Sequence, residues 1–281
     1  LLPVDRCLLL DQWAVRCAAD VQDAVVAAYA RYDFPEVVQR VQNFCTNEMG
    51  ALYLDITKDR LYTMATASHG RRSAQSAMLR ILEAMARWLA PLFAFTSEEI
   101  WQHMPHEMHV PTEIRGGFTV RDASVLFETW YQGLRQAQDS PDQRRWWSDL
   151  LAIRDTAARV LEGMRKDGRI GSSLDAIVTL HADPAVAERY RHVADELRFF
   201  FIVSELRLDV GEARADAVLT ELEGAKVWVS ADVSQAAKCV RCWHHRDDVG
   251  RDPEHPELCG RCVENVAAFE GHGAGETRRY F

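Results

Sequence analysis

The sequence predicts a mainly α-helical protein: a helical bundle, followed by a small α+β segment and a cysteine-rich tail. Two observations carry this prediction. Apolar residues recur every three or four positions through the first hundred residues, which is the period of one face of an α-helix. Four of the seven cysteines lie in two Cys-x-x-Cys pairs within the last fifty residues, where the sequence has lost that period.

The composition is that of an ordinary globular chain, and it excludes several classes of protein. With 281 residues and 48% hydrophobic residues, the chain can form packed cores. Its longest apolar runs, such as residues 199–203, fall far short of the roughly 18 residues of a membrane span. The net charge of −9 argues against a general nucleic-acid binder, because neutralising phosphates requires clustered Lys and Arg. A local basic face remains compatible with this charge.

Both the start of the chain and its cysteines point to the cytoplasm. The first residues, LLPVDRCLLLDQW, lack the basic flank and the cleavage site of a secretory signal. The first residue is Leu rather than Met, so we expect the chain to be part of a longer protein. Seven cysteines, three of them scattered through helix-like sequence, do not suit a disulfide framework.

Four amphipathic helices are predicted in the first hundred residues, each with one apolar stripe. The stripes cover residues 10–28, 38–52, 74–92 and 96–104. Asp33 and Pro35 separate the first two. The fourth is expected to open with a capping box, in which Thr96 caps the first turn and Glu99 reaches back, and to stop at Pro105. Together these helices predict a bundle whose core holds three stripe residues, Trp13, Trp88 and Trp101.

The second half of the chain is predicted to mix helices and strands. Residues 105–124 have no period and are expected to form a loop, with a short extended piece at 124–131. A helix is expected from Ser140 to Met164, ended by Gly168. Alternating residues predict strands at 176–181 and 225–233, and a single helix is expected between them, from Asp183 to about Val203.

The two cysteine pairs have the spacing of a structural zinc site. Cys239 and Cys242 form one pair, and Cys259 and Cys262 form the other after sixteen intervening residues. Two such loops place four thiolates at about 2.3 Å from one ion and close a tetrahedral shell. The intervening stretch is almost free of apolar residues, so metal binding would supply its folding free energy. A redox pair is disfavoured because no βαβ pattern surrounds it, whereas the spacing alone does not exclude an iron centre.

The loop that carries the first cysteine pair is also a candidate RNA contact. Lys238, Arg241, Arg246 and Arg251 make it locally positive, and Trp243 offers a stacking face. A charged surface around a small metal core explains the same residues equally well. Three nearby histidines are expected to be solvated or to contact phosphate rather than to bind metal, because four cysteines complete the shell: His244, His245 and His255.

Several stretches of the chain resemble one enzyme family. NFCTNEMGALYLDITKDRLY (43–62), RRSAQ (71–75) and LAPLFAFTSEEIW (89–101) resemble, in order and spacing, the anticodon-binding bundle of class Ia aminoacyl-tRNA synthetases. The isoleucyl, valyl and leucyl enzymes share that bundle. The tail, with KCVRCWHH and CGRCVENV, resembles the C-terminal zinc module of bacterial isoleucyl-tRNA synthetases, and GRIGSSLDAIVTLHAD (168–183) is similar to their junction segment. The resemblance covers essentially the whole chain.

The resemblance implies three parts and a function. The parts are an anticodon-binding helical bundle at 1–131, a helical and α+β junction at 132–234, and a four-cysteine zinc module at 235–281. The complete enzyme would be an isoleucine-tRNA ligase that is monomeric and cytoplasmic. Its N-terminal domains would bind ATP, charge tRNA(Ile) and edit misacylated valine. This chain has no HIGH-like or KMSKS-like signature, so we expect it to bind tRNA(Ile) and to be inactive alone.

The resemblance also implies site residues. The four paired cysteines carry over as ligands of one structural Zn²⁺. The predicted tRNA contacts are Arg71, Arg72, Arg241, Trp243 and Arg246. A structural interpretation competes for the helical positions, because acids and bases alternate there: Asp55 or Asp59 would pair with Arg60, Arg71 or Arg72 across helices.

Two other classes of protein are compatible with the same cysteine pattern. DNA-repair glycosylases have a similar C-terminal two-pair finger, but they need an N-terminal proline followed by glutamate, which LLPVDR does not supply. A non-catalytic interaction protein that docks a partner through a zinc ribbon is the third hypothesis. The leading hypothesis is a module whose bundle grips the unstacked bases of the anticodon stem-loop, while zinc rigidifies the tail so that its basic loop touches the same RNA.

Overall fold

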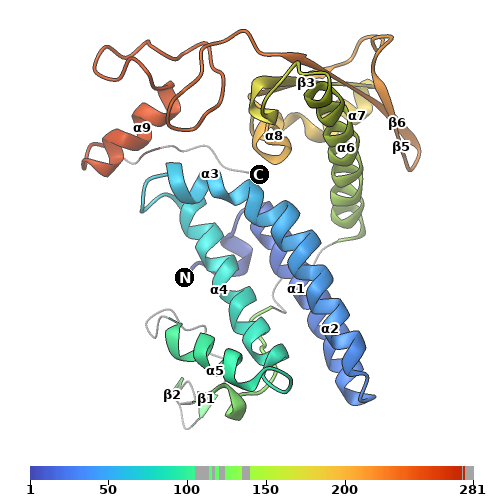
Figure 1. Ribbon diagram of the computed structural model, residues 1–281, viewed down its shortest axis with the longest axis vertical. Coiled ribbons are helices and arrows are strands. Elements are labelled where there is room, and N and C mark those ends of the chain that lie inside the picture. The colour runs from blue at the N-terminus through green and yellow to red at the C-terminus, as the bar shows by residue number, and fades with distance from the viewer. Residues whose placement is uncertain (105–113, 116–117, 120–123, 135–139, 274, 276–281) are drawn as a thin grey trace. The chain divides into compact units, whose positions relative to one another are not determined.

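The computed structural model describes residues 1–104, 114–115, 118–119, 124–134, 140–273 and 275 (Figure 1). The chain forms two compact units. Unit 1 comprises Leu1–Thr57 and His69–Gln138, and unit 2 comprises Lys58–Ser68 and Asp139–Phe281. The three-part division at residues 131 and 234 stays a prediction.

Unit 1 is a helical bundle, as the periodicity predicts. Its helices are α1 (Leu9–Ala30), α2 (Phe34–Asn43), α4 (His69–Leu89) and α5 (Ala94–His103). Shorter elements complete it: a 3-10 turn at Val4–Arg6, the π-helical stretch η2 (Phe44–Leu54), strands β1 (Ile114–Arg115) and β2 (Phe118–Thr119), and the 3-10 turn η4 (Val125–Phe127). Helix α3 (Asp55–Thr63) leads from unit 1 into unit 2.

The core of unit 1 is apolar, and it contains hydrogen-bonded polar side chains. Trp13, Trp88 and Trp101 are at most 4% exposed, which confirms their predicted place in the core. The indole of Trp88 donates to the Gln22 side chain at 3.0 Å, and Gln22 donates in turn to the carbonyl of Tyr131 at 2.8 Å. These bonds remove the cost of burying an amide and an indole N–H.

A charged network lies in the same core. Arg87 of α4 donates to Glu83 at 2.6 Å and to Glu128 at 2.9 Å, and all three side chains are at most 5% exposed. Its guanidinium also lies over the ring of Trp101, 4.6 Å from the centroid. Buried charges of this kind are tolerated only as a hydrogen-bonded set.

Two local predictions for unit 1 are wrong. Helix α5 begins at Ala94 rather than at Thr96, because the carbonyl of Phe93 already accepts from the amide of Ser97 at 2.9 Å. Thr96 is therefore inside the first turn and does not cap it. The piece expected to be extended at 124–131 contains the turn η4, which Ser124 caps by accepting from the amide of Leu126 at 3.2 Å.

The second predicted helix, at 38–52, is helical throughout, but its geometry changes along its length. It continues beyond α2 as the wider π-helix η2, a geometry that the α-helical period does not distinguish. The predicted loop at 105–124 lies outside the described residues apart from Ser124 and the two short strands, in which Ile114 pairs with Thr119 and Arg115 with Phe118.

Unit 2 is built on a four-stranded mixed sheet of order β4-β3-β6-β5. Strands β3 (Ala176–Ala182) and β6 (Ala225–Val233) confirm the two predicted strands and pair antiparallel. Two further strands were not predicted: β4 (Glu205–Asp209), which is parallel to β3, and β5 (Val218–Leu222), which is antiparallel to β6. The helices are α6 (Pro141–Lys166), α7 (Pro184–Arg191), α8 (Ala194–Phe201) and α9 (Gly260–Phe269).

Local sequence explains the ends of α6. Ser140 and Gln143 form a capping box at its start, and Gly168 follows it with φ of +70°, which favours glycine. The helix packs on β5 and β6. The expected single helix from Asp183 to Val203 is wrong: Val193, at φ −117° and ψ 5°, interrupts it between α7 and α8. The break buries Val193, which is 5% exposed.

No described helix combines the length and hydropathy that a bilayer crossing requires.

Candidate metal centre and its attachment

The four paired cysteines lie together in unit 2. All are buried, and their sulfurs lie within 4.8 Å of one another. The Sγ atoms of Cys242 and Cys259 are 3.7 Å apart. A tetrahedron of four bonds of about 2.3 Å places its sulfurs roughly 3.8 Å apart, so the cluster fits one Zn²⁺. A disulfide would need about 2.05 Å.

The backbone of both loops is arranged around these sulfurs. In the first loop the amide of Trp243 donates to the carbonyl of Cys239 at 2.9 Å. In the second, Cys259 is the N-cap of α9, and its amide donates to the sulfur of Cys239 at 3.4 Å. Such N–H donors stabilise thiolate charge from outside the ligand shell. Among the described residues of the tail, the buried cluster consists of the cysteines alone, with Val249 and Leu258 packed at its edge.

The thiols share their protons. Hydrogen bonds with the neighbouring cysteines, Cys242 foremost, lower the pKa of Cys239, and the hydrogen bond with Cys239 in turn raises the pKa of Cys242 and Cys262. For Cys259 the hydrogen bonds act in opposite directions. The bond with Cys239 raises its pKa, but the bonds with Cys242 and Cys262 lower it by more, so that the pKa of Cys259 is lowered to about 7. The four groups therefore do not ionise independently. A divalent cation favours the thiolate at every ligand and brings all four to that form.

The histidines beside the cluster have structural partners. His244 is 5% exposed and packs edge-on against Phe199, with 5.4 Å between the ring centroids, so the expectation that it is solvated is wrong. The His245 ring lies 2.8 Å from the carbonyl of Ala236 and 3.3 Å from the Asp175 carboxylate. The metal-ligating group found among the described residues contains cysteines only.

Two arginines of the metal loops attach the tail to the end of α3. Arg261 lies between two ligands and donates to both carboxylate oxygens of Asp59, at 2.5 and 2.7 Å, and to the Thr63 hydroxyl at 3.3 Å. Arg241, from the other loop, donates to the Thr63 carbonyl at 2.7 Å. Asn265 adds a third link by accepting from the amide of Ala65 at 3.1 Å.

This attachment changes the interpretation of the charged helical residues. The structural hypothesis offered Arg60, Arg71 or Arg72 as partners of Asp55 or Asp59, and it did not include Arg261, which forms an ion pair with Asp59. The role of Arg261 was not predicted from the sequence. Its only signal was a basic residue inside a Cys-x-x-Cys pair, next to a ligand.

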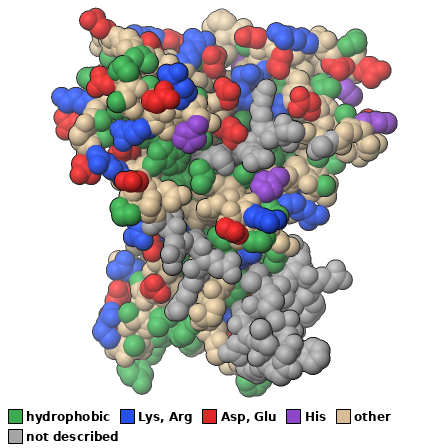
Figure 2. All heavy atoms as spheres, turned by 180° about the vertical axis from the view of Figure 1, so that it is seen from behind, with side chains coloured by type: hydrophobic (Ala, Val, Ile, Leu, Met, Phe, Trp, Pro, Cys, Tyr) green, Lys and Arg blue, Asp and Glu red, His purple; other side chains and the backbone are tan. Residues whose placement is uncertain are grey.

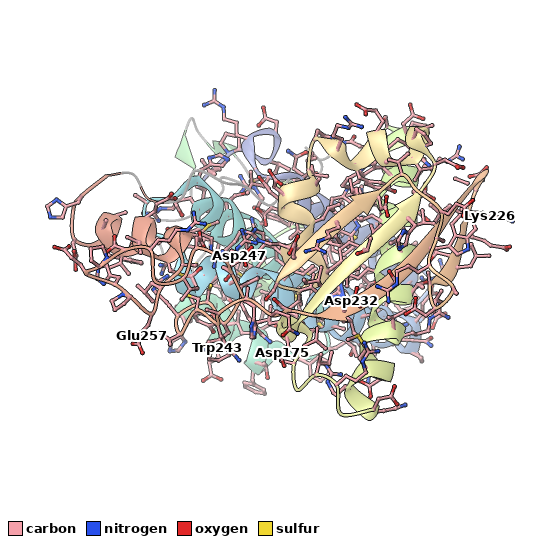
Figure 3. All side chains as sticks on the ribbon, turned by 90° about the horizontal axis from the view of Figure 1, so that it is seen from above. Asp175, Lys226, Asp232, Trp243, Asp247 and Glu257 are labelled. Carbon is pink, nitrogen blue, oxygen red and sulfur yellow. The ribbon has the colours of Figure 1, made fainter. Side chains whose placement is uncertain are left out.

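The predicted tRNA contacts lie in both units. Arg71, half-buried, and Arg72, exposed, are in the first turn of α4 in unit 1. Trp243 is 62% exposed and Arg246 is half-buried; both belong to the metal tail, on which Figure 3 labels Trp243, Asp247 and Glu257. The Arg241 side chain donates a hydrogen bond to the carbonyl of Thr63, which supports a structural role for it.

Replacing Arg261 with Met is expected to loosen the tail from α3. The change removes two charge-assisted hydrogen bonds and leaves Asp59, whose side chain is 17% exposed, without that partner. The expected loss is about 1.5–3 kcal/mol of unfolding free energy for unit 2, measured by denaturant titration. Arg251→Met, at an exposed position of the same tail, is the control and is expected to change stability by less than about 0.5 kcal/mol. Equal effects of the two substitutions would contradict the attachment.

Comparison with known proteins agrees with this geometry. Residues 11–180 match the family model described as the anticodon-binding domain of tRNA ligase, and residues 237–265 match a zinc finger found in FPG and IleRS. The chain is 45% identical to an isoleucine-tRNA ligase of Xanthomonas campestris pv. campestris (strain 8004), with 100% of this chain and 27% of the relative covered. It is 47% identical to an isoleucine-tRNA ligase of Thioalkalivibrio sulfidiphilus (strain HL-EbGR7), with 100% and 28% covered.

The chain therefore spans about a quarter of the length of these relatives. The match covers both the bundle and the cysteine tail, and the four buried cysteines lie inside the matched finger. The chain belongs to the tRNA ligase family defined by the anticodon-binding domain, and it is homologous to the anticodon-binding and zinc-finger region of isoleucine-tRNA ligases.

Proposed function

We propose that this chain is the part of an isoleucine-tRNA ligase that recognises the anticodon region of tRNA(Ile). The observation that carries the proposal is the joint match: one uninterrupted chain holds the anticodon-binding domain and a finger whose four cysteines meet in one cluster. ATP-dependent isoleucylation and editing would belong to the remaining three quarters of the enzyme. Homology to isoleucine-tRNA ligases fits a cytoplasmic enzyme, which we expect to be monomeric.

One structural Zn²⁺ would be held by Cys239, Cys242, Cys259 and Cys262. With four protein ligands the ion has no open position, so its role is to order the tail rather than to activate water. The arginines at 241 and 261 then link the ordered loops to the end of α3.

Within the tail, Trp243 and Arg246 are the best-placed RNA contacts. The Trp243 indole is exposed, and its backbone lies in the left-handed region at φ +66°, which costs free energy for any residue other than glycine. An exposed indole held in this way suits stacking on an unpaired base. In unit 1, the exposed Arg72 remains the better candidate of its pair for a phosphate contact.

The distribution of charge favours a few discrete contacts over a continuous basic surface. On the face shown in Figure 2, basic and acidic side chains are interspersed. With a net charge of −9, general attraction to phosphate would contribute little. Recognition would then depend on unstacked bases, as is usual for sequence-specific RNA binding.

The glycosylase hypothesis receives support only from the finger. The matched finger is of a kind found in FPG as well as in IleRS, so the tail alone does not separate the two functions. The remaining chain does, because residues 11–180 match a tRNA ligase domain. A zinc-ribbon interaction module without RNA binding would be favoured if tRNA failed to bind the zinc-loaded chain.

The test is tRNA binding by the zinc-loaded chain. Trp243→Ala is expected to weaken binding of tRNA(Ile) about tenfold, because one base loses its stacking partner. Tyr62→Ala is the matched control, since Tyr62 is an aromatic residue that is 75% exposed on α3, and it is expected to leave the affinity unchanged. Equal affinity of the unchanged chain for tRNA(Ile) and an unrelated tRNA would remove the specificity claim, and failure to bind either would refute the function.

A further inference from the structure

The turn between α1 and α2 holds an exposed aromatic residue in a strained backbone conformation. Among the described residues other than glycine, three have positive φ: Tyr32 at 59°, Ile202 at 54° and Trp243 at 66°. Tyr32 and Ile202 both follow the end of a helix, where glycine usually supplies this conformation. Tyr32 is 80% exposed, so packing does not explain why a large aromatic residue stands there. Strain retained at an exposed side chain indicates a functional site.

The ring of Tyr32 is supported from behind by other aromatic rings. Phe34 lies edge-on to it, with 6.3 Å between centroids, and Tyr29 lies 6.0 Å from Phe34. Tyr29 in turn packs against Trp130 at 5.8 Å, and its hydroxyl donates to the carbonyl of Trp88 at 2.7 Å. Through this chain of contacts, the exposed ring is anchored to the bundle core, as a stacking platform requires.

A polar groove of about 550 Å³ begins beside this platform and follows α2. Its lining includes the exposed Gln39, whose amide offers donors and an acceptor together. Other residues lining it are Asp33, Pro35, Glu36, Arg40 and, at the far end of α2, Asn43. An aromatic face next to an adjustable amide is the combination by which proteins hold a single splayed-out base.

The charges around the groove nearly cancel. Arg31 and Arg40 lie 2.7 and 3.4 Å from the carboxylate of Glu36, and Asp33 caps α2 by accepting from an amide. Two cations therefore face two carboxylates. This balance does not suit a phosphate or an acidic peptide, which need surplus positive charge, but it does suit the neutral edge of a nucleobase.

We propose that Tyr32 and Phe34 form a stacking platform for one unpaired nucleobase of the bound RNA, whose edge is read by Gln39. The proposal rests on the proposed function, because it assumes that unit 1 meets single-stranded RNA. It adds to the candidate contacts a site on the α1–α2 turn, which includes neither Trp243 nor the arginines of α4.

The test uses the zinc-loaded chain with Tyr32 replaced by Gly. Glycine adopts a φ of 59° without strain, so the variant is expected to melt at the same temperature or higher. Its affinity for tRNA(Ile) is expected to fall about tenfold, because the stacking face is lost. The slope of affinity against salt concentration should stay unchanged, since no phosphate contact is removed. Tyr32→Phe keeps the ring and should bind within about twofold of the unchanged chain.

Two further variants make the result interpretable. Tyr32→Asn also tolerates the left-handed region and provides a second test if the glycine variant fails to fold. Phe95→Ala, at a position that is 94% exposed on α5, is the matched aromatic control and should not change affinity.

The outcomes separate this proposal from the proposed function. If Tyr32→Gly binds tRNA(Ile) as tightly as the unchanged chain while Trp243→Ala binds more weakly, the platform is refuted and the function stands. A large loss of thermal stability in both the Gly and Asn variants would assign Tyr32 to folding and refute the platform as well. If the unchanged chain binds no tRNA, both proposals fail.

Discussion

Replacing Cys262 with Ser is expected to abolish metal binding and to unfold residues 235–273 and 275, the described part of the tail. Among these residues the buried apolar cluster consists of the four cysteines, so little apolar core would hold the segment once the ion is lost. Structural zinc sites of this type contribute about 10–16 kcal/mol of apparent folding free energy at pH 7. The loss therefore exceeds what the links through Arg241 and Arg261 can replace.

Zinc content by elemental analysis and protease sensitivity of the tail measure this effect. Cys45→Ser, at a half-buried cysteine in η2 of unit 1, is the control and should retain one equivalent of zinc. Zinc retention should also decline as pH falls, because protons compete with the ion for the thiolates. A metal-free Cys262→Ser chain with an unchanged, protease-resistant tail would contradict a structural metal site.

The second large effect is expected at the charged network in the core of unit 1. The side chains of Glu83 and Glu128 are at most 5% exposed, and replacing Arg87 with Met would leave their carboxylates buried without the cation that they share. Removing one partner of a buried charge set costs about 3–5 kcal/mol, because the remaining charges keep their desolvation penalty. Met preserves much of the side-chain volume against Trp101, so the cost reports the charge rather than a cavity.

Denaturant unfolding followed by the fluorescence of the buried tryptophans measures this loss. Arg31→Met is the matched control. The Arg31 side chain is 56% exposed in its ion pair with Glu36, so this substitution should change the free energy of unfolding by no more than about 1 kcal/mol. If the two substitutions lower the free energy of unfolding equally, the buried charged network does not stabilise unit 1 by the amount expected here.

The attachment of the tail gives the metal a role beyond its own loops. Arg241 and Arg261 come from different cysteine pairs, and both reach the end of α3, at Thr63 and Asp59. Ordering the loops around one ion sets the spacing of the two arginines. Loss of zinc should therefore also release this end of α3, and the Arg261→Met variant isolates that consequence without touching a ligand.

Local patterns predicted much of the fold. The stripes of α1 and α4, the start of α6 at Ser140 and the alternation of β6 depend on residues that are neighbours in sequence. The same patterns failed where packing overrides them. The interruption at Val193 buries a valine inside an apparently continuous helical period. Strand β5 was missed because it has only five residues, and its apolar Val218 and Leu219 are exposed whereas Thr220 is buried.

The candidate site divides in the same way. The spacing of the cysteines predicted their meeting, because two-residue gaps place paired sulfurs on one turn. The pairing of Arg261 with Asp59 was not predictable, since the two residues are 202 positions apart and Arg71 and Arg72 on α4 have the same charge as Arg261. Nor does any sequence pattern indicate that the backbone of Tyr32 is left-handed.

By itself, the sequence determined the helical character of the first hundred residues and the four-sulfur cluster, because helical period and ligand spacing act over a few neighbouring positions. Only the tertiary structure decided that Arg261 pairs with Asp59, where the helix before β4 breaks and which aromatic ring is exposed to solvent on a strained turn. Those outcomes depend on contacts between distant segments, whose free energies outweigh local preference.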